Sequence, residues 1–185
     1  SIDGKKFFKQ RILLKLKNSK SMMQKLIPKK EEEERRLKAL AEYRILGTKP
    51  ESCYDDITKI AASTCDVPIS LMTLVDRDKQ WFKSKVGLEI TETKRDWSFC
   101  THAIQENSPL IIQDAFQDER FINNPLVTGE PKIRFYAGFP LKNRDGNKLG
   151  TLCVIDRKPG NLSPKQYNVM ELLSKQIVSF LELRK

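Results

Sequence analysis

The sequence KIRFYAGFPLKNRDGNKLGTLCVID, residues 132–156, decides the fold of this 185-residue chain. Its two halves are rich in aromatic, β-branched and other apolar residues, a composition that favours β-strands. The segment between them contains Asp145-Gly146, a pair that is typical of the tight turn of a β-hairpin. The pattern therefore predicts two long antiparallel strands, residues 132–142 and 148–156.

A second hairpin is predicted upstream. The apolar run PISLMTLV, residues 68–75, is followed after Asp76-Arg77-Asp78 by QWFKSKV, residues 80–86. Two such runs separated by a short polar connection favour an antiparallel pair. Residues 110–113 are long enough only for an edge or connecting strand.

Helical spacing of apolar residues appears on both sides of these strands. Ser163 is a good N-cap and Pro164 suits the first helical position, so a closing helix is predicted from Ser163 to Arg184. Two earlier helices are predicted over residues 31–46, ended by Gly47 and Pro50, and over residues 54–66. This order predicts an α+β domain with a central antiparallel sheet, the N- and C-terminal helices on one face and an irregular middle segment with short helices on the other.

The net charge of +10 lies almost entirely in the first thirty residues, which hold ten basic residues and one acidic residue. We therefore divide the chain into a basic extension, residues 1–30, and a nearly neutral domain, residues 31–185. The extension interleaves Lys with apolar residues at helical spacing, which predicts a basic amphipathic helix. Such a helix could dock to a membrane surface or an acidic partner, or it could be a linker that packs on the domain or pairs with its copy.

Composition excludes several other classes. Specific nucleic-acid binding is not expected, because the basic charge belongs to the extension and not to the domain. The four cysteines form no CxxC pair and there is one histidine, so we expect reduced thiols and no metal centre. No apolar run approaches the roughly 20 residues of a membrane span, and the basic start does not fit a signal peptide. We therefore expect a cytoplasmic protein.

An ordered series of short motifs between residues 95 and 157 resembles a GAF domain. The motifs are WSFCTHAI (97–104), LIIQDA (110–115), FINNPLVTG (121–129), IRFYAG (133–138) and LGTLCVIDR (149–157). The resemblance covers residues 35–185, and its expected fold agrees with the elements predicted above. It implies a sensory module of the kind found beside histidine kinases and diguanylate cyclases, rather than an enzyme.

The resemblance also implies where a ligand would bind, namely between the sheet and residues 97–133, which we call the lid. The lid and the strand that follows it contain aromatic residues suited to apolar walls and polar residues suited to anchoring a ligand. Arg134 is the cation best able to hold an anionic group. The candidate ligand-binding residues are Trp97, Phe99, Cys100, His102, Asp114, Phe116, Phe121, Asn124, Thr128, Arg134 and Tyr136.

Each candidate also has a purely structural interpretation. The aromatic residues are of types that form any core, Asp114 and Arg134 could pair with each other or cap backbone groups, and Asn124 before Pro125 suits a turn. Cys100 and His102 are two positions apart, which on a helix places them on different sides and argues against a catalytic dyad. Their structural interpretation is a core thiol and a histidine that bonds a backbone or carboxylate partner.

Three special branches of the family do not match. Photoreceptor relatives that attach a bilin carry adjacent Cys and His, so no covalent chromophore is expected. The cyclic-nucleotide motif would require Asn147-Lys148 to precede Asp118-Glu119, and the order is reversed. The methionine sulfoxide reductases of this fold need further cysteines in the lid, and none lies between Cys100 and Cys153.

We therefore predict a non-enzymatic regulatory module that binds a small molecule, transmits a signal through its terminal helices as a homodimer, or does both. The alternative is an interaction scaffold without a ligand, whose basic helix contacts a membrane or acidic partner. The chain carries no output domain, so we expect it either to be part of a longer protein or to act on a separate partner. The identity of any ligand is left open.

Overall fold

The computed structural model describes residues 29–185 of the chain. Residues 29–42 are helical, and residues 37–185 form one compact unit, to which the following description refers. The predicted basic helix lies outside the described residues except for Lys29 and Lys30, so it stays a prediction.

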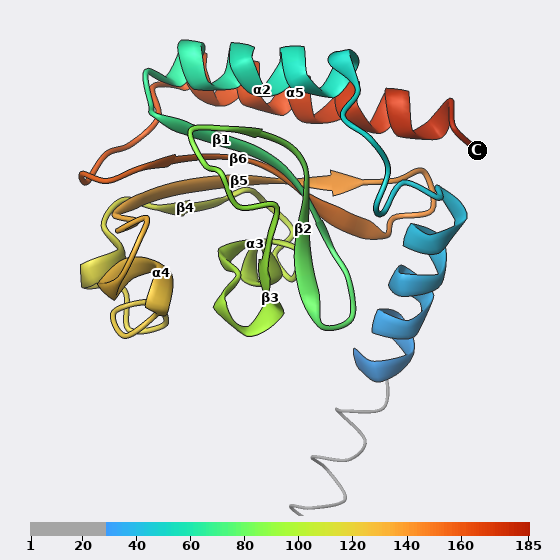
Figure 1. Ribbon diagram of the computed structural model, residues 1–185, viewed down its shortest axis with the longest axis horizontal. Helices are drawn as coiled ribbons and strands as arrows, with labels where there is room; N and C mark the ends of the chain where they lie inside the picture. The colour runs from blue at the N-terminus through green and yellow to red at the C-terminus, as the bar shows by residue number, and fades with distance from the viewer. Residues whose placement is uncertain (1–28) are drawn as a thin grey trace, which may run out of the picture. The chain divides into compact units, whose positions relative to one another are not determined.

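A six-stranded antiparallel sheet forms the centre of this unit, with the strand order β3-β2-β1-β6-β5-β4 (Figure 1). Both predicted hairpins are confirmed. They meet where β1 pairs with β6, which places Thr73 opposite Thr151 and Leu71 opposite Cys153. The strands are β1 (Ile69–Val75), β2 (Lys79–Val86), β3 (Glu92–Lys94), β4 (Leu110–Ile112), β5 (Phe135–Lys142) and β6 (Lys148–Asp156).

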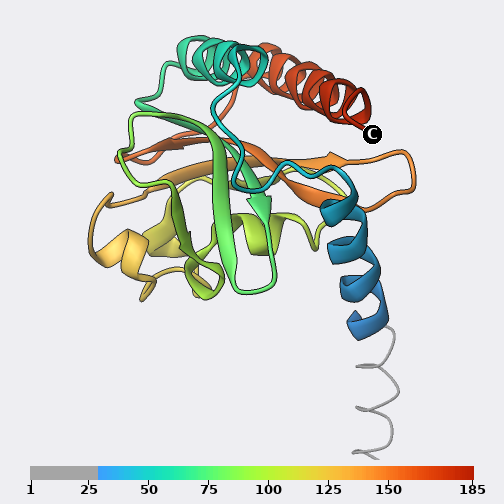
Figure 2. The same ribbon diagram turned by 45° about the vertical axis from the view of Figure 1, so that its right-hand side comes forward.

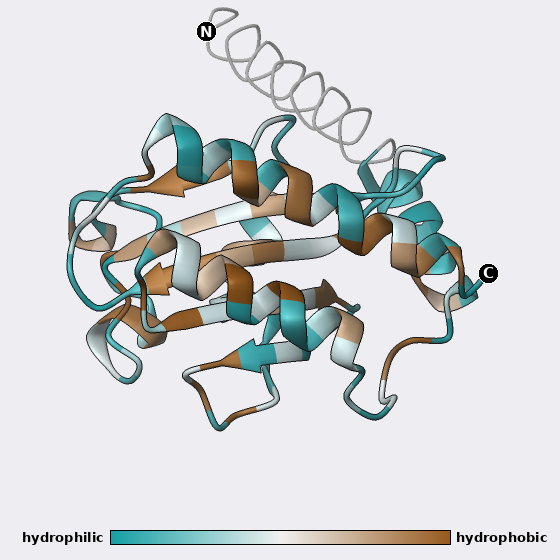
Figure 3. Ribbon diagram, turned by 90° about the horizontal axis from the view of Figure 1, so that it is seen from above, coloured by the Kyte–Doolittle hydropathy of each residue, from teal (hydrophilic) through white to brown (hydrophobic). Residues whose placement is uncertain are grey.

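Two long helices, α2 (Ser52–Cys65) and α5 (Pro164–Glu182), lie side by side over one face of the sheet (Figures 1 and 3). The helix α5 begins with a capping box: the Ser163 hydroxyl accepts from the Gln166 amide, and the Gln166 side chain accepts from the Ser163 amide. This arrangement satisfies two backbone donors that a helix start leaves free. Alternate residues of β1, β5 and β6 pack against these helices, including Met72, Phe139 and Val154.

The opposite face of the sheet is covered by short elements of the lid (Figures 1 and 2). The apolar core on this side is separate from the helix-side core, because successive strand residues point to opposite faces. The lid elements are η1 (Arg95–Trp97), which begins just before it, α3 (Phe99–Ala103), η2 (Ala115–Gln117) and α4 (Pro125–Thr128). The predicted α+β architecture, with helices on one face and a lid on the other, is confirmed.

Two boundaries differ clearly from the sequence prediction, and one strand was not predicted. The first helix ends at residue 42 rather than 46: the chain turns at Arg44, whose φ is 47°, and this turn buries Ile45 completely. The strand expected from residue 132 begins at Phe135, because Lys132 has a φ of 61° and leaves the extended conformation. The short strand β3 was not predicted, since its polar residues Glu92–Lys94 carry no apolar pattern.

Candidate functional site

A small cavity of about 20 Å³ lies between the sheet and the lid, where the resemblance placed a ligand. Space of this size holds about one water molecule. Its walls are mostly apolar, with a few polar or sulfur-bearing side chains among them. The lining residues are Leu71, Gln80, Phe82, Leu88, Ile90, Thr93, Phe99, Cys100, Leu126, Pro131, Ile133, Tyr136, Cys153 and Ile155.

A buried network of polar side chains stands beside this cavity, centred on the sulfur of Cys100. The Tyr136 hydroxyl donates to Cys100 Sγ at 3.2 Å, and the Thr151 hydroxyl donates to the same sulfur at 3.0 Å. A further bond of 3.2 Å joins the Thr151 and Thr73 hydroxyls. All four residues are buried, so these bonds satisfy polar groups that would otherwise be costly to keep away from water.

The network sets the order in which its groups lose their protons. Burial by itself would raise the pKa of the Cys100 thiol, but hydrogen bonds from Cys153, Thr151, Thr73 and Tyr136 outweigh it and lower the pKa. Burial, and then the bond to Cys100, raises the pKa of Cys153 well above its usual range. Burial and the charge of Cys100 likewise raise the pKa of Tyr136. Cys100 is therefore the group of this network that ionises first.

Gly138 makes room for the tyrosine of this network. A Cβ atom added at Gly138 would lie 2.1 Å from the Tyr136 hydroxyl oxygen and 2.6 Å from the ring carbon that bears it. The tyrosine ring therefore lies directly over the glycine backbone, two residues along the same strand. Any larger residue at position 138 would displace the donor to Cys100.

A second series of hydrogen bonds holds the start of α3 against the sheet. Ser98 is the N-cap of α3 and accepts from the Thr101 amide, while its hydroxyl donates to Gln80 Oε1 on β2 at 2.6 Å. The Gln80 amide in turn donates to the Thr93 hydroxyl on β3 at 3.3 Å. Ser98 and Gln80 are both buried, so the helix that carries Cys100 has a fixed position over the sheet.

Three of the predicted aromatic residues pack together next to the cavity. Phe99 and Phe121 are stacked with ring centroids 4.0 Å apart, and Phe99 also contacts Tyr136 at 5.1 Å. The His102 ring packs edge-on against Phe121 at 4.9 Å. Trp97 is half-buried at the rim of this core. Phe99, Cys100 and Tyr136 are thus the candidates that line the cavity.

The remaining candidates are engaged locally in the lid. Asp114 caps η2 by accepting from the Phe116 amide. Asn124 caps α4 by accepting from the Leu126 amide, and it donates to the Trp97 carbonyl at 3.0 Å. Its side chain thus bonds local backbone, but at the start of a helix instead of in a turn. The exposed Thr128 donates to the Asn124 carbonyl.

Arg134 was the expected cationic anchor, and the structure places it outside the cavity lining. Its guanidinium donates to the carbonyls of Val127 and Ile133 and lies 3.5 Å from the ring centroid of the exposed Phe116. Asp114 and Arg134 thus follow the second of the two alternatives, in which each serves backbone groups. Whether any of these residues contacts a ligand stays a prediction.

Sequence reasoning missed Thr73, Thr151, Gln80 and Ser98. The available signal was alternation: in the strands of residues 69–75 and 148–156, Thr73 and Thr151 interrupt otherwise apolar positions on one face. A polar residue at a buried strand position needs a partner, which marks it for attention even without a structure.

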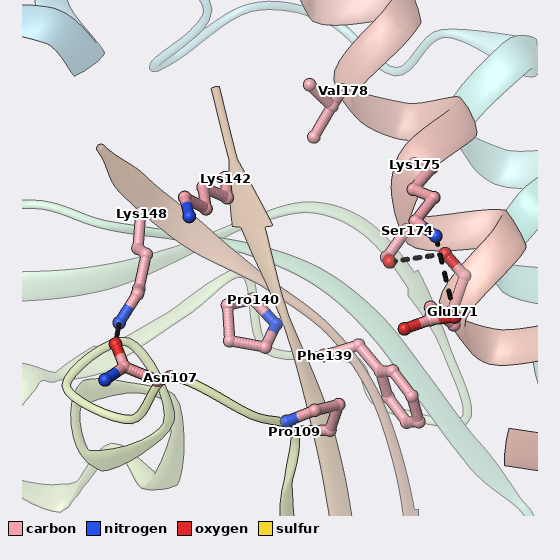
Figure 4. Close-up of a pocket in the computed structure, with 10 residues that line it drawn as sticks. All are labelled: Asn107, Pro109, Phe139, Pro140, Lys142, Lys148, Glu171, Ser174, Lys175 and Val178. Atoms are coloured by element: carbon pink, nitrogen blue, oxygen red, sulfur yellow. Dashed lines mark hydrogen bonds and ion pairs between the residues drawn. The ribbon is translucent and has the colours of Figure 1, made fainter. Parts of the chain in front are cut away.

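A larger hollow lies on the helix side, along the edge of α5 and β5, with a volume of about 410 Å³ (Figure 4). Lys142 and Lys148 lie on one side of this groove, and the ion pair of Lys175 with Glu171 lies on the other at 3.5 Å. Lys148 donates to the Glu106 carbonyl and to Asn107. The charged groups of the groove are thus largely engaged with the protein.

Two searches of residues 29–185 gave negative results. None of the described helices is long and apolar enough to cross a membrane. In the same part of the chain, no group of three or more His, Cys, Asp or Glu residues could hold a metal ion.

Comparison with known proteins shows relatives in signalling. A cyclic di-GMP phosphodiesterase of Pseudomonas aeruginosa is 37% identical over 153 residues, which are 82% of this chain and 26% of that protein. The chain thus spans about a quarter of the length of this relative.

Two solved structures share the fold at low identity. A free methionine-R-sulfoxide reductase of Neisseria meningitidis matches with a TM-score of 0.58 and 14% identity, over 77% of this chain and 84% of that one. A far-red cyanobacteriochrome photoreceptor matches with a TM-score of 0.57 and 11% identity, over 71% of this chain and 85% of that one. At such identities the likeness concerns the fold alone.

The family model of the GAF domain matches residues 49–180, which include every strand of the sheet, the lid and most of α5. The sheet, the covering helices and the lid described above are the architecture that the sequence motifs led us to expect. This chain therefore belongs to the GAF domain family.

Proposed function

We propose that this chain is a regulatory sensor domain whose input site is the cavity between the sheet and the lid. The observation that carries the proposal is the gathering of Cys100, Tyr136, Thr151 and Thr73 at one buried place beside that cavity. Packing alone would be served as well by apolar residues, because a buried polar network adds little net stability. Polar groups beside an apolar cavity are what recognition of a small molecule requires.

The size of the cavity sets the mechanism of such a sensor. A metabolite does not fit into about 20 Å³, so its binding requires that the lid move away from the sheet. A ligand that binds only the open arrangement shifts the population toward it, and the position of the lid then reports occupancy.

The output would pass through the two ends of the domain, which are tied together. The Tyr43 hydroxyl, just after the helix of residues 29–42, donates to Glu182 in α5 at 2.7 Å and accepts from Asn143 at 3.2 Å. An ion pair of 2.6 Å joins Lys185 and Glu42. A change in the direction of one terminal helix would therefore be felt by the other, and pairing of these helices in a homodimer would pass it to an output domain.

The chain itself would be non-catalytic and would need neither a metal nor a covalent chromophore. The P. aeruginosa relative is named a cyclic di-GMP phosphodiesterase, and this chain matches a quarter of it. We therefore favour an enzyme of cyclic dinucleotide turnover, in the same or a separate chain, as the output that the domain regulates.

One observation favours the alternative, an interaction scaffold without a ligand: the cavity is nearly filled by protein. In that case the basic residues 1–30 would act by docking to a membrane or acidic partner. A protein without residues 1–30 would then lose binding to anionic vesicles while its domain stays folded.

Native mass spectrometry of the purified chain, compared with its denatured mass, distinguishes these functions because it reports bound molecules and subunit count together. The sensor proposal predicts extra mass that is lost on denaturation and is reduced in Thr151→Val, which removes a hydroxyl group of the network beside the cavity. The matched control is Ser174→Ala in the α5 groove, which should retain the extra mass. If the extra mass is absent only in the Ser174→Ala protein, the ligand binds in the α5 groove and not in the cavity. A dimer of bare mass in every sample would support the scaffold.

A further inference from the structure

Two cysteines far apart in the sequence meet where the lid contacts the sheet. Cys100 on α3 and Cys153 on β6 both line the small cavity, and both are buried. Both belong to the same apolar core, and each thiol influences the pKa of the other. On β6, Cys153 is the next residue on the lid-facing side after Thr151, which donates to the Cys100 sulfur at 3.0 Å.

We infer that Cys100 and Cys153 are a thiol pair that hydrogen peroxide oxidises to a disulfide, which makes this cavity a modification site joining the lid to the sheet. The inference rests on the proposed role of the cavity as the input site, and it adds a chemical input, an oxidant, to the ligand that binds without a covalent bond. It depends on three properties of the pair, which are its contact, its hydrogen-bond donors and the size of the space beside it.

The donors make Cys100 the attacking sulfur. Thiolates, and not thiols, react with peroxides, and reactivity follows the stability of the thiolate. Two hydroxyl groups, from Tyr136 and Thr151, point at Cys100 Sγ at 3.2 and 3.0 Å. Burial raises the pKa of Cys153 well above its usual range in spite of bonds from Thr151 and the Leu71 backbone, so Cys153 keeps its proton more firmly, which suits the second, resolving role.

The cavity limits the size of the oxidant. Its volume of about 20 Å³ exceeds the roughly 10–15 Å³ that one water occupies. Hydrogen peroxide, with two oxygen atoms and no carbon, is the oxidant of thiols that comes nearest to this size. A hydroperoxide with a branched alkyl group would need the lid to open.

The reaction balances with hydrogen peroxide as the named co-reactant. The Cys100 thiolate attacks one peroxide oxygen, an S–O bond forms, the O–O bond breaks, and the departing hydroxide takes up the proton that the thiol released. The Cys153 sulfur then attacks the sulfur of the Cys100 sulfenic acid, an S–S bond forms, and the S–O bond breaks. The leaving hydroxide takes the Cys153 proton. Two thiols are oxidised, one peroxide is reduced, and two waters are released.

Such a bridge would change the lid in a defined way. It would replace the hydrogen bonds of Tyr136 and Thr151 to a thiolate by a covalent link between α3 and β6. The lid could then no longer separate from the sheet at this point.

The test is peptide mapping of the full chain after exposure to hydrogen peroxide, alkylation in denaturant and digestion with trypsin, without reductant. The four cysteines fall on four tryptic peptides: residues 45–59 contain Cys53, residues 60–77 contain Cys65, residues 96–120 contain Cys100 and residues 149–157 contain Cys153. The expected product links peptides 96–120 and 149–157, with a mass two hydrogen atoms below their sum. Cys65 is the internal control: because burial raises its pKa to about 11, it should escape oxidation and be found alkylated.

Two further measurements make the result specific. Tyr136→Phe should slow the bridging about fivefold, the rate equivalent of one net hydrogen bond, and tert-butyl hydroperoxide should bridge the pair more slowly than hydrogen peroxide does. A Cys53→Ser protein, which lacks the half-buried thiol, should react at the rate of the unaltered chain.

The inference is overturned if Cys100 and Cys153 are still alkylated when Cys53 is fully oxidised, or if Cys100 is oxidised to sulfinic acid without a link to Cys153. It is also overturned if the two oxidants react equally fast. None of these results touches the sensor proposal, because a ligand that is bound without a covalent bond would still appear in native mass spectrometry.

Discussion

A buried ion pair between β2 and the start of α2 allows a quantitative test of the structure. The side chain of Lys83 is fully buried, and its ammonium group donates to Glu51 Oε1 at 2.7 Å, Thr48 Oγ1 at 2.8 Å and the Lys49 carbonyl at 2.6 Å. Glu51 is 34% exposed and also accepts twice from Arg184, at 2.7 and 2.6 Å. One member of the pair is thus enclosed, and the other has a second partner and access to water.

This asymmetry predicts that removing the carboxylate costs more than removing the ammonium. Glu51→Gln leaves the Lys83 charge enclosed with neutral acceptors. Breaking a buried pair in this way costs about 3–5 kcal/mol of the free energy of unfolding. Because Lys83 keeps two oxygen acceptors, of Thr48 and Lys49, we expect a smaller loss of about 2–3 kcal/mol. Lys83→Met removes the buried charge and fills the same space with an apolar chain, while Glu51 keeps Arg184. We expect this change to cost about 1 kcal/mol, the size of one net hydrogen bond.

The measurement is urea unfolding of both variants and the unaltered chain, followed by tryptophan fluorescence, with the free energy of unfolding extrapolated to water. The Glu51→Gln protein should be less stable than the Lys83→Met protein by about 1–2 kcal/mol, which is a lower Tm by about 2–8 °C for a chain of this size. Arg184→Ala is the control and should cost less than about 1 kcal/mol, because its ion pair is partly exposed. Equal losses, or a larger loss for Lys83→Met, would show that the Lys83 ammonium is hydrated and that the reasoning is wrong.

Three further predictions follow from single residues. Gly138→Ala should destabilise the protein by about 1–3 kcal/mol in urea, because the added Cβ overlaps Tyr136; if the loss is absent, the ring does not lie over the glycine. Ser163→Ala should cost about 1 kcal/mol by removing the cap of α5, and an unchanged midpoint would contradict the capping box. Burial and then the charge of Arg120 lower the pKa of His102 below 6.5, so the unfolded chain binds the proton first. The contribution of His102 to the free energy of unfolding should therefore be fully present above pH 6.5 and be lost as the pH drops through the folded pKa. Urea unfolding above and below pH 6.5 measures this dependence, and the His102→Gln protein should lack it.

The elements that were predicted correctly are those in which one local pattern dominates. The hairpin of β5 and β6 has long apolar strands and an Asp-Gly turn, and α5 has a cap and an apolar face of helical period. The strand β3 has neither, because its three polar residues are held only by pairing with β2. The end of the first helix was missed for a related reason: Ile45 continues the helical spacing, but tertiary packing buries it better from a turn.

The residues of the candidate site differ in the same way in how far they could be predicted from local sequence. Phe99, Cys100 and Tyr136, which line the cavity, could be chosen from the sequence because they lie in the short motifs that resemble a GAF domain. Thr73 and Thr151 could not be chosen as a pair, since nothing local shows that β1 and β6 are neighbours in that register. Arg134 shows the converse limit, because a charged side chain in the expected region can be satisfied by carbonyls of its own loop.

The arrangement of β5 and β6 would allow the proposed sensor to use a cavity that is almost full. On the lid side these strands carry Tyr136 and Cys153, and on the helix side β5 carries Phe139, whose ring packs edge-on against Tyr167 of α5 at 5.1 Å. Alternate residues of one strand thus contact the lid network and the closing helix, with only the backbone between them. A closely packed interior has little free volume in which to absorb a displacement. A change at the lid that moves Tyr136 must therefore shift β5 against α5, unless Tyr136 returns to its place. A filled cavity would thus pass a displacement of the lid to α5 better than an empty one.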